Sequence, residues 1–140
     1  MKWVGTPYSW AGGSATGPTL GICTSGAAAN DCHIVGFDCS GLTEYAYAQA
    51  GLALPHSAAA QYDAGPHIAQ ADLQPGDLLF LATNLSDPAT IHHVAMWIGN
   101  DSLVQAPESG QNIDIVQHPF TSAAFTAQYI GATRPTLPGA

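Results

Sequence analysis

Phe37-Asp38-Cys39-Ser40-Gly41-Leu42 opens the main helix that the sequence predicts. Asp38 is a residue type that caps helix N-termini, because its carboxylate accepts a backbone N–H of the first turn. Beyond it, side chains recur at helical spacing at Leu42, Tyr45, Ala46 and Gln49. Gly51 is a candidate end of this helix. The pattern therefore predicts a helix that begins directly after Asp38 and carries Cys39 in its first turn.

The chain changes character after this helix. A second short helix is predicted at 57–62, opened by Pro55. Short apolar segments bounded by turn residues then predict strands at 78–83, 93–99, 102–106, 113–117 and 128–133. Because the helices precede the strands, and tight turns such as residues 99–101 join neighbouring strands, we expect an α+β fold with an antiparallel sheet.

Composition limits the function of this 140-residue chain. Hydrophobic residues make up 46%, which indicates a folded domain. Lys2 and Arg134 are the only basic residues against ten acidic ones, so the formal charge is −8. This balance excludes nucleic acid as a partner and disfavours an anionic membrane surface. No apolar run approaches the ~20 residues of a membrane span. We expect one domain over residues 1–134 and a disordered tail at 135–140.

Cys39 is a candidate nucleophile. Unpaired N–H groups and the helix dipole stabilise a thiolate at a helix N-terminus, which predicts a lowered thiol pKa. The alternative is a small buried residue at a helix start.

A nucleophilic thiolate needs a base, which is usually histidine. Four of the six histidines fall in loop or turn positions: His33, His56, His67 and His118. His92 and His93 open a predicted strand instead. His93 shares a face with Ala95 and Trp97, and the other face carries the apolar set Val94, Met96 and Ile98, which should face a core.

A shift of one residue in register would exchange His92 for His93, so both remain candidates at this point. Gln105, on the next strand, lies within cross-strand reach of His93 and can fix the orientation of its ring. The alternative for Gln105 is a residue that faces solvent.

Five motifs occur in order along the chain: Thr-Pro-Tyr-Ser-Trp-Ala-Gly-Gly at 6–13, Phe-Asp-Cys-Ser-Gly-Leu at 37–42, Leu-Pro-His-Ser at 54–57 with Gln61, Leu-Gln-Pro-Gly-Asp-Leu at 73–78, and His-Val to Ile-Gly-Asn at 93–100. Taken together, they resemble the NlpC family of bacterial cell-wall cysteine endopeptidases, which are papain-like. The resemblance runs from about Gly5 to Arg134. It implies N-terminal helices that carry the cysteine, packed on a five- or six-stranded antiparallel sheet.

The resemblance also implies roles for individual residues. Cys39 would be the nucleophile, His93 rather than His92 the base, and Gln105 the third catalytic residue. The backbone N–H of Cys39 would contribute to an oxyanion hole. The candidate substrate contacts are Tyr8, Asp38, Ser40, His56 and Ser57. No cofactor or metal is expected.

Two features depart from the family pattern. The third position is often histidine, whereas Gln105 is neutral and cannot stabilise an imidazolium as a carboxylate would. An insertion at about 14–36 carries Cys23, Cys32 and His33. We predict a Cys23–Cys32 disulfide, which would contribute about 2–3 kcal/mol in the chain-entropy model and requires an oxidising compartment. A zinc site that includes His33, or two free thiols, are the alternatives.

The resemblance implies a substrate and a location. The substrate would be a peptidoglycan stem peptide, cut between D-γ-glutamyl and a diamino acid such as meso-diaminopimelate. The protein would be a monomer, secreted or associated with the cell wall, and this chain would be a mature fragment without its signal peptide. Two alternatives stay open: a non-catalytic domain that binds peptidoglycan or a partner, and a papain-like amidase or acyl transferase with another substrate.

Overall fold

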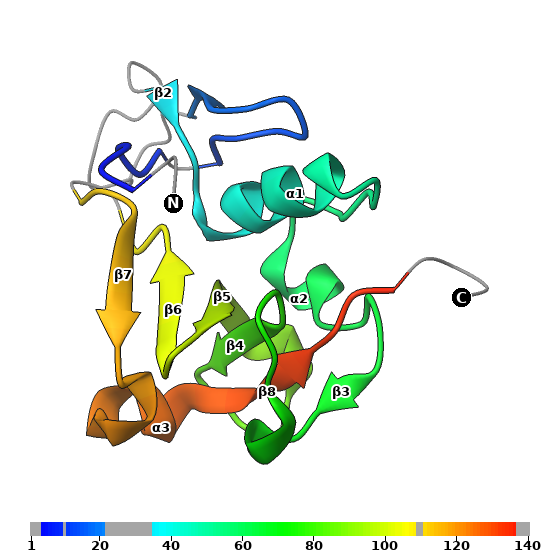
Figure 1. The fold of residues 1–140 in the computed structure, drawn as a ribbon, viewed down its shortest axis with the longest axis vertical. Helices are drawn as coiled ribbons and strands as arrows, with labels where there is room; N and C mark the ends of the chain where they lie inside the picture. Colours follow the sequence, from blue (N-terminus) through cyan, green and yellow to red (C-terminus); the bar gives the residue numbers. More distant parts are fainter. Residues whose placement is uncertain (1–3, 10, 22–34, 109–110, 137–140) are drawn as a thin grey trace.

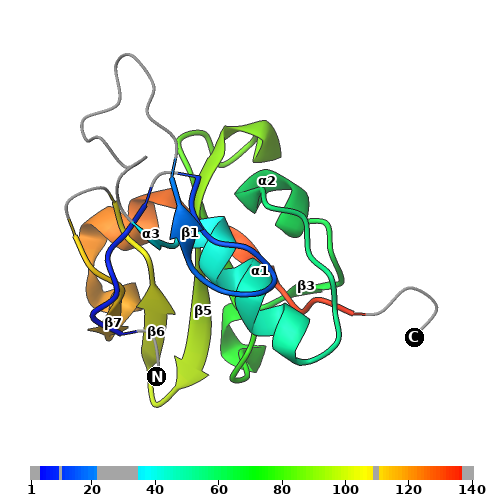
Figure 2. The same cartoon turned by 90° about the horizontal axis from the view of Figure 1, so that it is seen from above.

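The computed structural model describes residues 4–9, 11–21, 35–108 and 111–136. Its centre is a six-stranded antiparallel sheet in the order β3-β8-β4-β5-β6-β7. Helices α1 (Cys39–Gln49) and α2 (Ala58–Gln61) pack on one face, and α3 (Ala123–Gln128) lies by the other (Figures 1 and 2). The predicted α+β class with an antiparallel sheet is confirmed.

Five of the six strands of this sheet follow predicted segments, and β3 was not predicted. The six strands are β3 (His67–Ile68), β4 (Leu78–Ala82), β5 (Ile91–Gly99), β6 (Ser102–Gln105), β7 (Asp114–Gln117) and β8 (Tyr129–Thr133). Strands β4 to β7 are neighbours in chain order, and β8 returns to pair with β4. A separate pair, β1 (Thr19–Leu20) with β2 (Val35–Gly36), was not predicted. Short 3₁₀ turns occur at η2 (Gln70–Asp72), η3 (Pro88–Thr90) and η4 (Pro119–Thr121).

The helix boundaries follow from local capping. Asp38 caps α1 as predicted, and Gly51, which follows the C-cap residue, has a φ of +88° that favours glycine. Helix α2 is shorter than the predicted 57–62. It is capped by Ser57, whose Oγ accepts from the Ala60 N–H at 3.3 Å, and not by Pro55.

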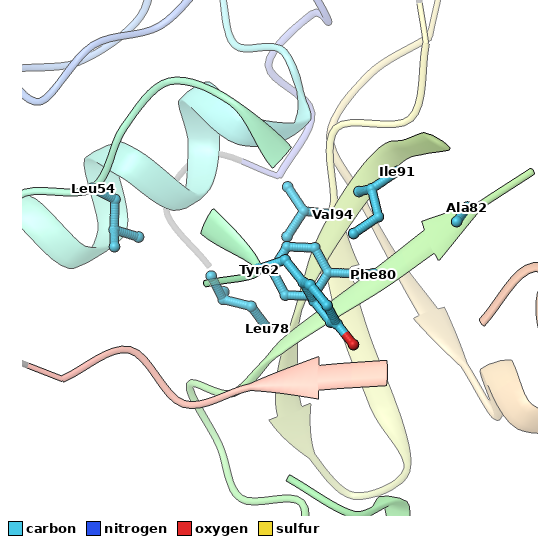
Figure 3. Close-up of a cluster of buried hydrophobic side chains, with 7 residues drawn as sticks. All are labelled: Leu54, Tyr62, Leu78, Phe80, Ala82, Ile91 and Val94. Carbon is cyan, nitrogen blue, oxygen red and sulfur yellow. The ribbon is translucent and has the colours of Figure 1, made fainter. Parts of the chain in front are cut away.

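The core facing α1 and α2 is built on two central strands. Phe80 and Val94 are fully buried there and pack with Tyr62 and Leu54 (Figure 3). This layer fixes the start of α1 against β5, because Cys39 itself packs on the same cluster.

The second face of the sheet is also buried. Ala95 and Trp97 of β5 are 2% and 9% exposed. Phe120 and Phe125 from η4 and α3 pack against them. The sequence did not predict this second core, because it did not predict α3.

Candidate active site

The site begins with the Asp38 side chain, just before α1. Its Oδ1 accepts the Gly41 N–H at 2.7 Å, while the Asp38 carbonyl accepts the Leu42 N–H at 3.0 Å. The first of these bonds satisfies one of the donors that a helix start leaves unpaired, and the second is the first hydrogen bond of the helix itself. They fix the first turn, and Cys39 is the first residue of that turn.

Gly41 is required by close approach of neighbouring groups. A Cβ at this position would lie 2.2 Å from the Gly12 carbonyl oxygen, 2.8 Å from Asp38 Oδ1 and 3.0 Å from His56 Cε1. The Gly12 oxygen also accepts the Asp38 N–H at 2.9 Å. The glycine therefore lets three segments meet around the start of α1.

Cys39 is a half-buried free thiol between α1 and β5. Burial raises its pKa to about 11, with the Asp38 charge as the second cause, while the backbone N–H groups of Val94, Ser40 and Cys39 lower it in part. The predicted lowering of this pKa is wrong, because desolvation and the adjacent carboxylate outweigh the helix N-terminus. The contact with Val94 puts the sulfur beside the residue that follows His93.

His93 lies on β5 and contacts Gln105 on β6, as predicted. Its Nε2 is 2.9 Å from Gln105 Oε1. An amide oxygen only accepts, so Nε2 carries the proton and Nδ1 keeps the lone pair. Burial lowers the pKa of His93, and the Gln105 bond and the Asp114 charge offset this only in part. His93 is therefore a neutral imidazole at pH 7, with Nδ1 able to accept a proton.

A register shift separates His92 from His93. Leu81 pairs with His93 and Ala82 with Ile91, so His92 has no partner position on β4. His92 is exposed and its Nε2 lies 2.8 Å from Gln128 Oε1. The structure thus separates the two histidines that the sequence left open, because such an irregularity redirects side chains.

His56 contacts two carboxylates. Its Nε2 is 2.7 Å from Asp38 Oδ1 and its Nδ1 is 3.2 Å from Glu44 Oε1. The hydrogen bond to Asp38 is the main reason that the pKa of His56 is raised, and the charges of Asp38 and Glu44 add to it. Sequence reasoning missed Glu44, which lies within α1 and has no motif of its own.

The other predicted substrate contacts lie near the same helix start. Ser40 is 5% exposed, and its Oγ donates to Asp38 Oδ1 at a long 3.5 Å. Tyr8 is 7% exposed and packs with Phe37 and Leu42. Ser57 is exposed and caps α2.

Gln61 supports the start of α1, although no role was predicted for it from the sequence, whereas Arg134 pairs with Asp77. Gln61 is fully buried and its Nε2 donates to the Ser40 and Pro55 carbonyls at 3.0 and 2.8 Å, which ties α2 to the first turn of α1. Arg134 donates to both carboxylate oxygens of Asp77 at 2.8 and 2.9 Å. Its charge is therefore already paired within the fold.

Several predictions concern residues that the structure does not describe. Cys23, Cys32 and His33 lie outside the described residues, as do 137–140 of the predicted tail. Within residues 4–9, 11–21, 35–108 and 111–136, no cluster of three or more His, Cys, Asp or Glu side chains could hold a metal ion. No helix in that part of the chain is long and apolar enough to cross a membrane.

An open cavity of about 310 Å³ borders the histidine side of the site. It is lined by Leu81, His92, His93, Gln105, Pro107 and Glu108. Glu108 contributes a carboxylate to this lining, and its Oε1 accepts from Gln111 Nε2 at 3.0 Å.

A cysteine in the first turn of a helix, beside a strand whose histidine is held by a third polar residue, is the arrangement of a papain-like cysteine peptidase. The family can be named more narrowly. The model of the NlpC/P60 family matches residues 5–134, and the chain belongs to this family. The resemblance seen in the sequence is confirmed.

Three relatives illustrate the match. The peptidoglycan endopeptidase RipA of Mycolicibacterium smegmatis is 42% identical over 115 residues, which is 82% of this chain and 21% of RipA. The γ-D-glutamyl-L-lysine dipeptidyl-peptidase of Bacillus cereus is 32% identical over 94% of this chain and 33% of its own length. A solved structure of RipA, the resuscitation-promoting-factor-interacting protein, mutated at a histidine, superposes with a TM-score of 0.78 at 31% identity, over 96% of this chain and 57% of that one. The chain thus spans only part of each relative.

The thiol environment gives a direct prediction. Asp38→Asn keeps an N-cap but removes the charge that helps to raise the pKa of Cys39. At pH 9.5 the Cys39 peptide should be alkylated by iodoacetamide roughly three- to tenfold faster, since one pKa unit is a tenfold change in thiolate. Mass spectrometry after chymotrypsin digestion, which cuts after Phe37 in both proteins, separates Cys39 from Cys23 and Cys32. Unchanged or slower alkylation would show that Asp38 does not disfavour the thiolate.

Proposed function

We propose that this domain hydrolyses an amide bond of peptidoglycan stem peptides through a covalent intermediate on Cys39. Both partners start neutral, because the pKa of the thiol is raised and that of His93 is lowered. The Sγ proton passes to His93 Nδ1 as the sulfur attacks the carbonyl carbon. The backbone N–H of Cys39 donates to the resulting oxyanion.

The second half of the reaction returns the site to its starting state. The tetrahedral intermediate collapses, His93 gives its proton to the leaving amine, and a thioester remains on Cys39. His93 then takes a proton from water, which attacks the thioester and releases a carboxylic acid. The proton returns to the sulfur, so no cofactor enters the balance. The observation that carries this proposal is the contact of Cys39 with Val94 beside a His93 ring held by Gln105.

A comparison supports the role of Gln105. RipA structures include forms mutated at a histidine and at a glutamate that are separated by the same number of positions as His93 and Gln105. The glutamine here would orient the imidazole as that glutamate can, but without its charge. We therefore assign Gln105 a positioning role in this chain.

The proposed bond lies between D-γ-glutamyl and a diamino acid, meso-diaminopimelate being one such residue. The relatives' names support this class, since one cuts after γ-D-glutamyl and another is a peptidoglycan endopeptidase. The cavity beside His93 supports it too, because the Glu108 carboxylate can pair with the second amine of a diamino acid leaving group. We propose that Tyr8, Asp38, Ser40 and Ser57 contact the acyl side of the substrate.

We also propose that the domain acts outside the reducing cytosol, at the cell wall, as a monomer. The peptidoglycan substrate of the relatives supports this location. The Cys23–Cys32 disulfide belongs to the same proposal, since it requires an oxidising compartment.

The function is tested with defined muropeptides. The purified protein should release a new amine from a stem peptide that contains γ-D-glutamyl-meso-diaminopimelate, and mass spectrometry should place the cut at that bond. Cys39→Ala, which removes the nucleophile, should release none. Absence of any product, or equal release by Cys39→Ala, would contradict the proposal and favour a binding domain.

Gln105 offers a graded test of the same site. Gln105→Glu should raise kcat several-fold, because a carboxylate stabilises the imidazolium that forms in each half-reaction. Gln105→Ala should lower kcat roughly 10- to 100-fold, a part of the usual effect of general acid–base catalysis. Steady-state kinetics on one muropeptide measures both. Equal kcat in all three proteins would show that Gln105 has no role in catalysis.

A further inference from the structure

We propose that His56 is a positioning residue for the nucleophile: as an imidazolium held between Asp38 and Glu44, it cancels the charge of Asp38 beside Cys39. This differs from the predicted substrate-binding role of His56. Its catalytic consequence rests on the proposed function, whereas its effect on the thiol does not.

The geometry favours a charged ring. A neutral imidazole carries one N–H and can donate to one carboxylate only. His56 has a carboxylate oxygen 2.7 Å from Nε2 and another 3.2 Å from Nδ1. Glu44 Oε1 is also buried without a hydrogen bond, so the positive charge of His56 is what compensates it. Both contacts are therefore satisfied best by the doubly protonated form.

Few other charges bear on this ring. The charged groups that the structure records against His56 are Asp38, before α1, and Glu44, within it. Helix α2, which follows His56, is Ala-Ala-Ala-Gln and carries no titratable side chain. Arg134, the one arginine of the chain, is bound to Asp77. In the described part of the chain, His56 is thus the cation that can offset Asp38.

The offset acts on Cys39 through Asp38. The Asp38 carboxylate disfavours the thiolate of the next residue. When His56 is protonated, the pair with Asp38 is neutral and this effect weakens. The two carboxylates raise the pKa of His56, so the proton is held to higher pH than in a free histidine and is lost as the pH rises further. Loss of that proton exposes the Asp38 charge to the thiol.

The test compares Cys39 alkylation by iodoacetamide at pH 6.5 and pH 9.5 in matched variants. His56→Gln keeps a donor to Asp38 but has no charge, and should react three- to tenfold more slowly than the parent at pH 6.5 and equally at pH 9.5. His56→Arg keeps the charge at both values and should react faster than the parent at pH 9.5. Adding Asp38→Asn to His56→Gln should restore the rate at pH 6.5.

A control and a second readout separate the possible outcomes. The control is His118→Gln. It breaks another exposed histidine–carboxylate pair, in which His118 Nδ1 lies 2.7 Å from Asp101 Oδ2, far from Cys39 in sequence. This variant should leave the alkylation rate of Cys39 unchanged at both pH values. The second readout is kcat/KM for a muropeptide as a function of pH. This value should fall in the parent as the pH rises and His56 deprotonates, and should not fall in His56→Arg. Equal slowing of His56→Gln at both pH values, or no slowing, would overturn the proposal. If the parent cuts no muropeptide but the alkylation pattern holds, the proposed function fails and the role of His56 stands.

Discussion

The Asp38 carboxylate organises the start of α1 and, with it, the site. One oxygen accepts the N–H of Gly41 and contacts the ring of His56, each at 2.7 Å. The cap fixes the turn that carries Cys39, but its charge also disfavours the thiolate of that residue. The carboxylate that caps the helix thus disfavours ionisation of the proposed nucleophile, and in our proposal the charge of His56 offsets this effect.

The proposed mechanism therefore starts from a neutral pair. Burial raises the pKa of Cys39 and lowers that of His93, so neither is charged in the free protein at pH 7. Gln105 fixes the tautomer of His93 but adds no charge to stabilise an imidazolium. In the mechanism that we propose, proton transfer then accompanies attack on the substrate, and charges of the substrate help to stabilise the reacting groups. A chain of net charge −8 has few cations with which to do this otherwise.

Local signals account for what the sequence predicted. The Asp38 cap and the helical spacing that follows it predicted α1. The tight turn after Gly99 predicted the β5–β6 hairpin, which brings Gln105 to His93. The features that escaped prediction depend on tertiary contacts. Helix α3 has six residues, too few for a periodic pattern, yet its Phe125 packs with Phe120 and Tyr129 on one face of the sheet. The contact of Glu44 with His56 and the raised pKa of Cys39 depend on burial and on the packing of α1. No sequence motif indicates either feature.

The central claim is that Cys39 forms a covalent acyl intermediate during hydrolysis. Intact-mass measurement of protein quenched in acid within milliseconds of mixing with a muropeptide tests it most directly. The account predicts a mass increase equal to the acyl part of the substrate, located on the peptide that contains Cys39 and absent from Cys39→Ala. Turnover without such an adduct, or an adduct on any other residue, would contradict it.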